Sequence, residues 1–261
     1  MVEQKEQLLS DNPCVFLPHY GEFGWLIMHH IRLINHFKSP YKTVCCPSDH
    51  RVYFPSANEF IDWVNPLPDA DRQGIMRCFE NDDRTKLIKL FRETRKEYDI
   101  IESNKFSIDL LSEIFKLNPI SQIKEIPLVS ICARNRNRRA WQNCNKWDKI
   151  IEYLLSKNYK VASIGKKDSS KFFYQIKINS WDYPDNESAC VEILSKSKLY
   201  LGNNSGMSHL AAFCQTPMIV FDEIPRGRNF IRNMQATNKN YCKWFPGNNT
   251  EEIIKQIEKL L

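Results

Sequence analysis

Short apolar segments alternate with helix-like segments throughout the second half of the chain. The helix-like segments carry apolar residues at intervals of three and four, which places those residues on one helical face. Short apolar strands joined by amphipathic helices are typical of βαβ units, whose parallel sheet is covered by helices on both faces. The sequence therefore predicts an α/β fold, with strands at 128–132, 160–164, 176–181, 199–202 and 217–221 and helices at 147–155, 185–194 and 207–214.

The first half repeats this alternation less regularly. Proline residues near both ends of 118–125 mark the natural linker between the halves. At 261 residues the chain is long enough for two domains. We therefore expect one domain at 1–122, a second at 123–249 and a terminal helix at 250–261. Within the first domain the pattern predicts strands at 14–17, 42–46 and 98–102, helices at 24–37, 83–97 and 108–117, and an irregular stretch at 47–68.

Charge is distributed unequally between the two halves. Residues 1–125 contain 16 Lys and Arg against 19 Asp and Glu, a net of −3, whereas residues 126–261 contain 21 against 12, a net of +9. The second half is therefore the one suited to an anion, whether nucleotide phosphate, nucleic acid or acidic lipid. A lysine-rich, solvated surface is the alternative explanation.

Cysteine usage and hydropathy indicate the cellular environment. No run approaches the roughly 18 apolar residues of a membrane span, and the amino terminus is too polar for a signal peptide. The nine cysteines are an odd number and several lie in apolar runs, which favours buried thiols in a reducing compartment. We therefore expect a cytoplasmic protein without a transmembrane segment. No set of cysteines and histidines has the spacing of a zinc site.

The strongest local motif is Gly202–Ala212. An expected strand ends there in a Gly-Asn-Asn-Ser-Gly turn that opens directly into a helix. The first backbone N–H groups of such a helix are unpaired, and with the helix dipole they form an anion site. Ser205 would cap the helix or contact a phosphate, and His209 would lie one turn further in. The alternative is a structural turn with a capping serine and a core histidine.

A basic segment follows the strand at 128–132. It contains Arg134, Arg136 and Arg138, and Lys166 follows Gly165 at the end of the neighbouring strand. Ligands of doubly wound sheets bind beyond the carboxyl ends of the strands. Guanidinium groups bind phosphate oxygens there through paired hydrogen bonds. A solvated basic loop is again the alternative.

A third motif, His19–Trp25, also leads from a strand into a helix. Its two glycines let the backbone approach a ligand, and they place Glu22 at the rim of the first sheet. A carboxylate in that position can act as a general base. Equally, Glu22 can stabilise the positive end of the helix at 24–37.

Taken together, residues 127–222 resemble the carboxyl-terminal domain of glycosyltransferases with the two-Rossmann, B-type fold, and most closely the ADP-heptose:lipopolysaccharide heptosyltransferase group. The resemblance rests on the basic strand end before Lys146-Trp147, on Ile164-Gly165, and on Gly202–Ala212 followed by Thr216-Pro217. It implies two Rossmann-like domains facing across a cleft, in a compact version because the chain is shorter than usual for the family. It also implies that the terminal helix at 250–261 packs back on the first domain.

The resemblance further implies an activity. It predicts a metal-independent, inverting glycosyltransferase of hexosyl or heptosyl type, which needs no cofactor and moves a sugar from a nucleotide-sugar donor to a hydroxyl of a glycan or another acceptor. Glu22 occupies the position of the family's catalytic base, and His19 is expected to orient Glu22 or the acceptor. The expected donor-binding residues are Arg134, Arg136, Arg138, Gly165, Lys166, Asn204, Ser205, Gly206, Met207 and His209. Their positive charge would replace a metal ion at the leaving diphosphate.

Two other functions are compatible with the residues. The basic second half, with its arginines at 226, 228 and 232, would hold a nucleic acid, as in an enzyme that glycosylates hydroxylated DNA bases. A non-catalytic module that binds a nucleotide or another polyanion on a Rossmann frame is the second, because fold does not fix function. Turnover of a nucleotide sugar and salt-sensitive binding of DNA distinguish the three.

Overall fold

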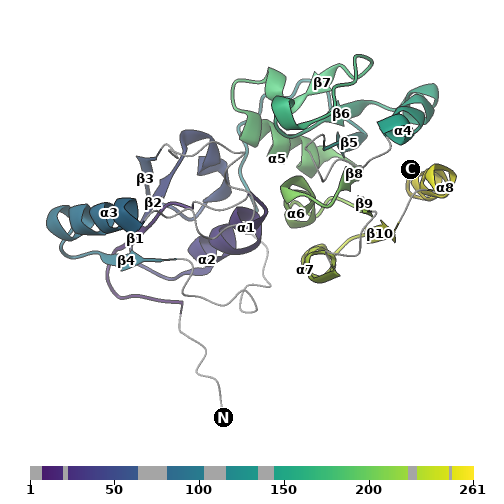
Figure 1. Ribbon diagram of the computed structural model, residues 1–261. Helices are drawn as coiled ribbons and strands as arrows, with labels where there is room; N and C mark the ends of the chain where they lie inside the picture. The colour runs from purple at the N-terminus through teal and green to yellow at the C-terminus, as the bar shows by residue number, and fades with distance from the viewer. Residues whose placement is uncertain are drawn as a thin grey trace, which may run out of the picture. The chain divides into compact units, whose positions relative to one another are not determined.

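The computed structural model of the chain describes residues 8–19, 23–63, 81–102, 116–134, 144–222, 228–246 and 249–261. The chain forms two compact units, Met1–Asn118 and Pro119–Leu261, and each contains a parallel sheet with its own helices (Figure 1). The predicted α/β class is therefore confirmed. The division between the units falls a few residues before the expected end of the first domain at 122.

The first unit is built on a four-stranded parallel sheet with the strand order β3-β2-β1-β4. The chain builds the sheet outward from β1 to β3 and then returns to β4 on the other side of β1. Consequently β1 and β4 are neighbours, with Val15 opposite Ile100. The strands are β1 (Cys14–Phe16), β2 (Lys42–Cys46), β3 (Glu59–Asp62) and β4 (Asp99–Ile101).

A continuous helical stretch follows β1, with a π-helical turn in its middle. It consists of α1 (Phe23–Trp25), the π turn η1 (Leu26–His30) and α2 (Ile31–His36). The predicted helix at 24–37 is thus present, but its π turn leaves no simple signal in the sequence. The helix α3 (Asn81–Thr94) precedes β4, and its Leu87 and Phe91 pack into a core shared with β1 and β2.

The structure differs from the sequence prediction in two segments of the first half, 47–68 and 108–117. The stretch at 47–68 was expected to be irregular, but it contains the 3-10 helix η2 (Ser48–Tyr53) and the edge strand β3. The residues of β3 are only partly buried or exposed, so that strand lacks the apolar pattern of the central strands. Most of the helix expected at 108–117 lies outside the described residues, and the described part, 116–117, is not helical.

The second unit is built on a six-stranded parallel sheet with the order β10-β9-β8-β5-β6-β7. This is the strand order of a Rossmann fold, in which all strands are parallel and the order of strand addition reverses between the first and fourth strands, here β5 and β8. The strands are β5 (Val129–Cys132), β6 (Val161–Ser163), β7 (Ile178–Asn179), β8 (Leu199–Asn203), β9 (Met218–Asp222) and β10 (Cys242–Pro246).

Helices cover both faces of this second sheet (Figure 1). Alternate residues of β8 serve the two faces: Leu199 and Leu201 join the core beneath α4 and α8, whereas Tyr200 reaches Ser208 on α6. This double coverage explains why the strands read as continuous apolar runs. The helices are α4 (Cys144–Ser156), α5 (Asn186–Lys196), α6 (Gly206–Phe213), α7 (Arg228–Thr237) and α8 (Thr250–Leu260); α7 and β10 were not predicted.

The terminal helix α8 packs on the second unit. Ile253 and Ile257 are buried in the core that contains α4, and the Tyr153 hydroxyl of α4 donates a 3.2 Å hydrogen bond to Glu258 Oε1. The apolar face predicted for this helix is therefore covered by α4, and not by the first domain as the resemblance implied. The prediction that this helix needs a partner surface is confirmed, and the partner is α4 of the same unit.

The first residues of the second unit are fixed to α5. The Glu192 carboxylate accepts hydrogen bonds from the backbone N–H groups of Gln122 (2.8 Å) and Ile123 (3.0 Å) and from the Ser121 hydroxyl (3.0 Å). The Ile120 N–H donates to Ser188 Oγ at 2.6 Å. These contacts explain why the second unit begins at Pro119.

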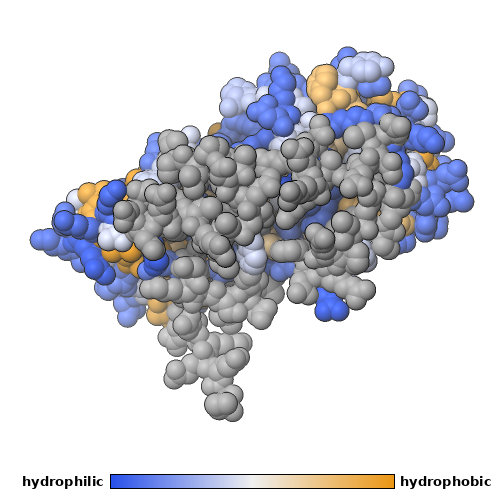
Figure 2. All heavy atoms as spheres, in the orientation of Figure 1, coloured by the Kyte–Doolittle hydropathy of each residue, from blue (hydrophilic) through white to orange (hydrophobic). Residues whose placement is uncertain are grey.

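The surface of the described residues is mostly hydrophilic on the face shown in Figure 2, where apolar side chains form small separate groups. No helix in the described ranges is both long enough and apolar enough to cross a lipid bilayer.

Candidate functional site

The carboxyl ends of β5 and β8 meet at the switch point of the second sheet. Arg134 follows β5, and its backbone N–H donates a 3.3 Å hydrogen bond to Oδ1 of Asn203, the last residue of β8. At such a point the connections that follow the two strands run in opposite directions and leave a crevice between them, in which doubly wound proteins bind ligands. The Arg134 backbone and the turn after Asn203 therefore form one side of a candidate ligand site.

The end of β6 joins this site through Gly165. Its φ of +116° is rarely adopted by residues with a side chain, and its N–H donates to Ser180 Oγ at 3.1 Å. A Cβ on Gly165 would lie 3.7 Å from Cys132 Sγ and 3.8 Å from Met207 Cγ. The ends of β5 and β6 and the first turn of α6 thus lie against one another.

The turn between β8 and α6 is supported from below by a buried hydroxyl chain. Ser208 Oγ donates a 2.5 Å hydrogen bond to the carbonyl of Asn203, and Tyr200 Oη lies 3.0 Å from Ser208 Oγ. Because the Ser208 proton is used toward Asn203, the Tyr200 hydroxyl is the donor to Ser208. Ser205 occupies the N-cap position, but its side chain makes no capping hydrogen bond, contrary to one of the two roles expected for it.

The groups below the turn are held in their neutral forms. Burial raises the pKa of the Cys132 thiol to about 11 and raises the pKa of the Tyr200 phenol well above its usual range. Both groups therefore act as hydrogen-bonding supports and not as nucleophiles or bases. The positive charge near the turn comes instead from basic residues such as Arg134 and Lys166.

The basic residues predicted for the site are only partly described. Arg134 is half-buried and forms an isolated antiparallel bridge with Ser170, which follows the short 3-10 helix η5 (Lys167–Ser169). Lys166 precedes that helix and is exposed at the same edge of the sheet. Arg136 and Arg138 lie outside the described residues.

The remaining predicted donor residues differ in burial. Asn204, Ser205 and Gly206 are half-buried at the turn, whereas Met207 and His209 are only 8% and 5% exposed. The His209 side chain therefore belongs to the interior of the second unit, and the turn residues 204–206 are the more accessible part of the motif. It was not predicted from the sequence that Asn203, Tyr200 and Ser208 support the turn. The Asn203-Asn204 pair in the turn is a sequence signal for the role of Asn203.

The first unit has a corresponding switch point between β1 and β4. The Leu17 N–H donates to the Ile101 carbonyl at 3.2 Å, so His19 and Glu102 leave the sheet at the same edge. Glu102 forms an ion pair with Arg84 of α3, and neither residue was predicted from the sequence. Glu22 lies outside the described residues.

The imidazole of His19 lies against that of His30, with 5.4 Å between the ring centres. His30 is 2% exposed. Burial, reinforced by the neighbouring His19, His29 and His50, holds the pKa of His30 well below its usual range. His30 is therefore neutral at pH 7.

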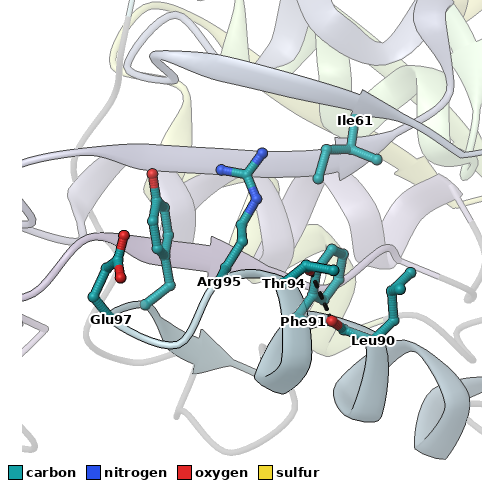
Figure 3. Close-up of a pocket in the computed structure, with 7 residues that line it drawn as sticks. Ile61, Leu90, Phe91, Thr94, Arg95 and Glu97 are labelled. Carbon is teal, nitrogen blue, oxygen red and sulfur yellow. Dashed lines mark hydrogen bonds between the residues drawn. The ribbon is translucent and has the colours of Figure 1, made fainter.

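A separate cavity of about 510 Å³ lies in the first unit between α3 and β3 (Figure 3). Its cation, Arg95, contacts both carboxylate oxygens of Glu59, at 2.5 and 2.7 Å, and lies 5.0 Å from the centre of the Tyr98 ring. Glu59 begins β3 and Tyr98 precedes β4, so this pairing lies at the amino ends of the strands. The cavity is thus at the edge of the sheet opposite His19.

Neither a protein-family model nor a curated protein matches the chain by sequence. Its fold is similar to that of E. coli ADP-heptose lps heptosyltransferase II, with a TM-score of 0.61 and 10% identity over 95% of this chain and 98% of that one. It is also similar to a glycosyl transferase family 9 protein from Veillonella parvula DSM 2008 (TM-score 0.54, 11% identity, 98% and 92% covered). A third similar structure is E. coli heptosyltransferase WaaC with ADP (0.52, 12%, 94% and 97%).

The resemblance stated from the sequence is therefore confirmed at the level of the fold. Coverage is nearly complete for both partners in the comparison with heptosyltransferase II, so the likeness includes both units. At identities of 10–12% it concerns the fold and not the residues of a site.

Proposed function

We propose that this protein is a glycosyltransferase that moves a sugar from a nucleotide-sugar donor to a hydroxyl acceptor. The observation that carries the proposal is the convergence of Arg134, Gly165 and the Ser205 turn at the switch point of the second sheet. The fold similarity to heptosyltransferases adds support, and one of those structures is named as holding ADP.

In this proposal the second unit binds the donor diphosphate. The N–H groups at 205–207 lie at the positive end of α6, and the arginines at 134, 136 and 138 supply guanidinium groups. These groups stabilise the negative charge that grows on the leaving diphosphate, so that no metal ion is needed for that purpose.

The first unit binds the acceptor. Glu22 takes the proton from the acceptor hydroxyl as its oxygen attacks the anomeric carbon. The bond between that carbon and the diphosphate oxygen breaks, and its electron pair leaves with the nucleoside diphosphate. A single displacement of this kind inverts the anomeric configuration. His19, at the carboxyl edge of the same sheet, orients the acceptor.

The test is a thermal-shift screen against ADP-, UDP-, GDP- and CMP-sugars, with the free nucleotides alongside. A donor that binds only the folded protein raises the melting temperature. We expect one nucleotide class to do so, and Arg134→Ala to reduce that shift. The matched control is Arg232→Ala, which removes an exposed arginine of α7.

Turnover is then measured as release of the nucleoside diphosphate from the donor that binds. Binding without any turnover would favour the non-catalytic module, and binding of none of the nucleotides would reject the proposal. None of the three similar structures is named for a nucleic acid, so the comparisons give no support to a DNA base as the acceptor.

A further inference from the structure

His30 is a buried imidazole with no hydrogen-bond partner among the described residues. It is 2% exposed, and neither Nδ1 nor Nε2 makes a hydrogen bond. A neutral imidazole carries one N–H donor and one lone-pair acceptor, and leaving both unused inside a protein reduces stability. An unpaired buried polar group needs an explanation, and a role in catalysis is one of the recognised explanations.

The backbone around His30 is also unusual. His30 ends the π-helical turn Leu26–His30, which interrupts an otherwise α-helical segment. Single π turns inside helices occur frequently at functional sites, because the extra residue redirects a side chain. This observation is independent of the unpaired nitrogens, and both concern the same residue.

The contact with His19 gives the unpaired nitrogens a partner within reach. The ring centres are 5.4 Å apart and the ring planes are inclined by 42°. An imidazole nitrogen lies about 1.2 Å from its ring centre, so two nitrogens turned toward each other would be about 3 Å apart, a hydrogen-bond distance. The Phe54 ring packs edge-on against the His30 ring, with 6.0 Å between the ring centres and 88° between the ring planes.

We propose that His30 is a positioning residue for His19. On acceptor binding the two imidazoles form an N–H···N hydrogen bond, which fixes the tautomer and orientation of His19. The other His19 nitrogen then faces the acceptor hydroxyl and holds it for attack. The inference rests on the proposed glycosyl transfer for the identity of the acceptor, but the pairing itself does not depend on it.

The electrostatic surroundings are consistent with this role. The titratable groups that act on His30 are His19 beyond β1, His29 on the same helix and His50 in η2. Burial and these three neighbours keep His30 neutral, the form that can both donate and accept a hydrogen bond. Within the described residues, the two imidazoles are not part of any group of three possible metal ligands within 4.8 Å of one another.

The test compares three variants. His30→Phe keeps a ring and removes both nitrogens; His30→Gln keeps one donor and one acceptor; His29→Phe removes the adjacent, partly exposed imidazole. If His30 acts through His19, His30→Phe folds with an unchanged or higher melting temperature, while kcat for nucleotide release falls at least tenfold with little change in the donor KM. His30→Gln should recover most of that loss, and His29→Phe should leave kcat unchanged.

Nitrogen-15 NMR of the histidine rings supplies a readout that needs no substrate. We expect the pKa or tautomer ratio of His19 to change in His30→Phe and not in His29→Phe. An unaltered His19 spectrum together with unaltered kcat and pH profile overturns the inference. So does a loss of melting temperature alone, or a Zn²⁺-induced thermal shift that His30→Phe abolishes, because the pair would then be a structural or metal site.

The two failures are distinguishable. If the wild-type protein releases nucleotide from no donor, the proposed function fails, whatever the His19 spectrum shows. If the wild-type protein turns over and His30→Phe behaves identically by both readouts, only the role of His30 fails.

Discussion

The backbone N–H of Arg134 donates a 3.3 Å hydrogen bond to the side chain of Asn203, which joins the ends of β5 and β8 at the point where the strand order of the second sheet reverses. This bond fixes the distance between the Arg134 backbone and the turn before α6. It also explains why Asn203 is 5% exposed although its amide is polar.

We expect Asn203→Ala to weaken donor binding about tenfold and to reduce the free energy of unfolding by about 1 kcal/mol, the usual value of one such hydrogen bond. Asn203→Asp keeps the acceptor oxygen but adds a negative charge beside the diphosphate, so binding should fall further. The measurements are nucleotide titration and urea denaturation. Asn240→Ala serves as the control, because Asn240 tethers Gln215 through its amide and lies outside the candidate site. Equal loss of nucleotide affinity in the control would refute the assignment.

Gly165 gives a prediction about backbone conformation. At φ +116° a side chain is strained, and a Cβ would also press on Ser170 Oγ at 3.3 Å. Gly165→Ala should therefore cost about 1–3 kcal/mol in the free energy of unfolding, and it should also weaken nucleotide binding because the end of β6 must shift. Asn158 has a φ of 58°, so Asn158→Gly, which relieves a left-handed residue, is the control and should change stability by less than about 0.5 kcal/mol. A Gly165→Ala protein as stable as the wild type would contradict the structure.

The turn at 202–206 could be predicted because its signal is local. A strand that ends in glycine, asparagine and serine before a helical pattern specifies both the turn and the helix start. The buried hydroxyl chain from Tyr200 through Ser208 could not be predicted. It depends on which face of β8 meets α6, and that follows from strand register and packing.

The strand β3 was missed for a physical reason. β3 is an edge strand whose residues are partly buried or exposed, so it lacks an apolar run. For the terminal helix, the apolar face in the sequence predicts that the helix packs on a partner surface. It does not predict which surface that is. The pairing of His19 with His30 likewise depends on the packing of the helix against β1.

Glu22 gives the prediction that tests the reaction most directly. Glu22→Gln removes the proposed base but keeps the side-chain shape, so turnover should fall by 10²-fold or more, within the usual contribution of a general base. Donor binding should be unchanged, because the donor lies on the other unit in the proposal. The measurement is nucleotide release alongside the thermal shift. Glu97→Gln, an exposed carboxylate at the amino edge of the first sheet, is the control. Full turnover in Glu22→Gln would discard the base assignment.

Glu192 gives a prediction about stability and pH. Burial favours its neutral form, but the N–H groups of Gln122 and Ile123, with Lys196 and Ser121, outweigh burial and lower its pKa below the usual value of 4.5. A carboxylate whose pKa is lower in the folded state stabilises the fold fully above its unfolded-state pKa. That contribution is lost as the pH falls through the folded-state pKa. The free energy of unfolding should therefore decline as the pH falls below about 4.5.

Glu192→Gln should cost about 2–3 kcal/mol at pH 7, because several hydrogen bonds to a charged group are weakened together. It should also flatten the decline of stability below pH 5. Urea denaturation between pH 3 and pH 7 measures both effects. Glu258→Gln is the matched control: this exposed carboxylate accepts one hydrogen bond, from Tyr153, so its loss should cost less than about 1 kcal/mol. If Glu192→Gln kept the full acid sensitivity of the wild type, the carboxylate would not be the group that holds residues 121–123 on α5.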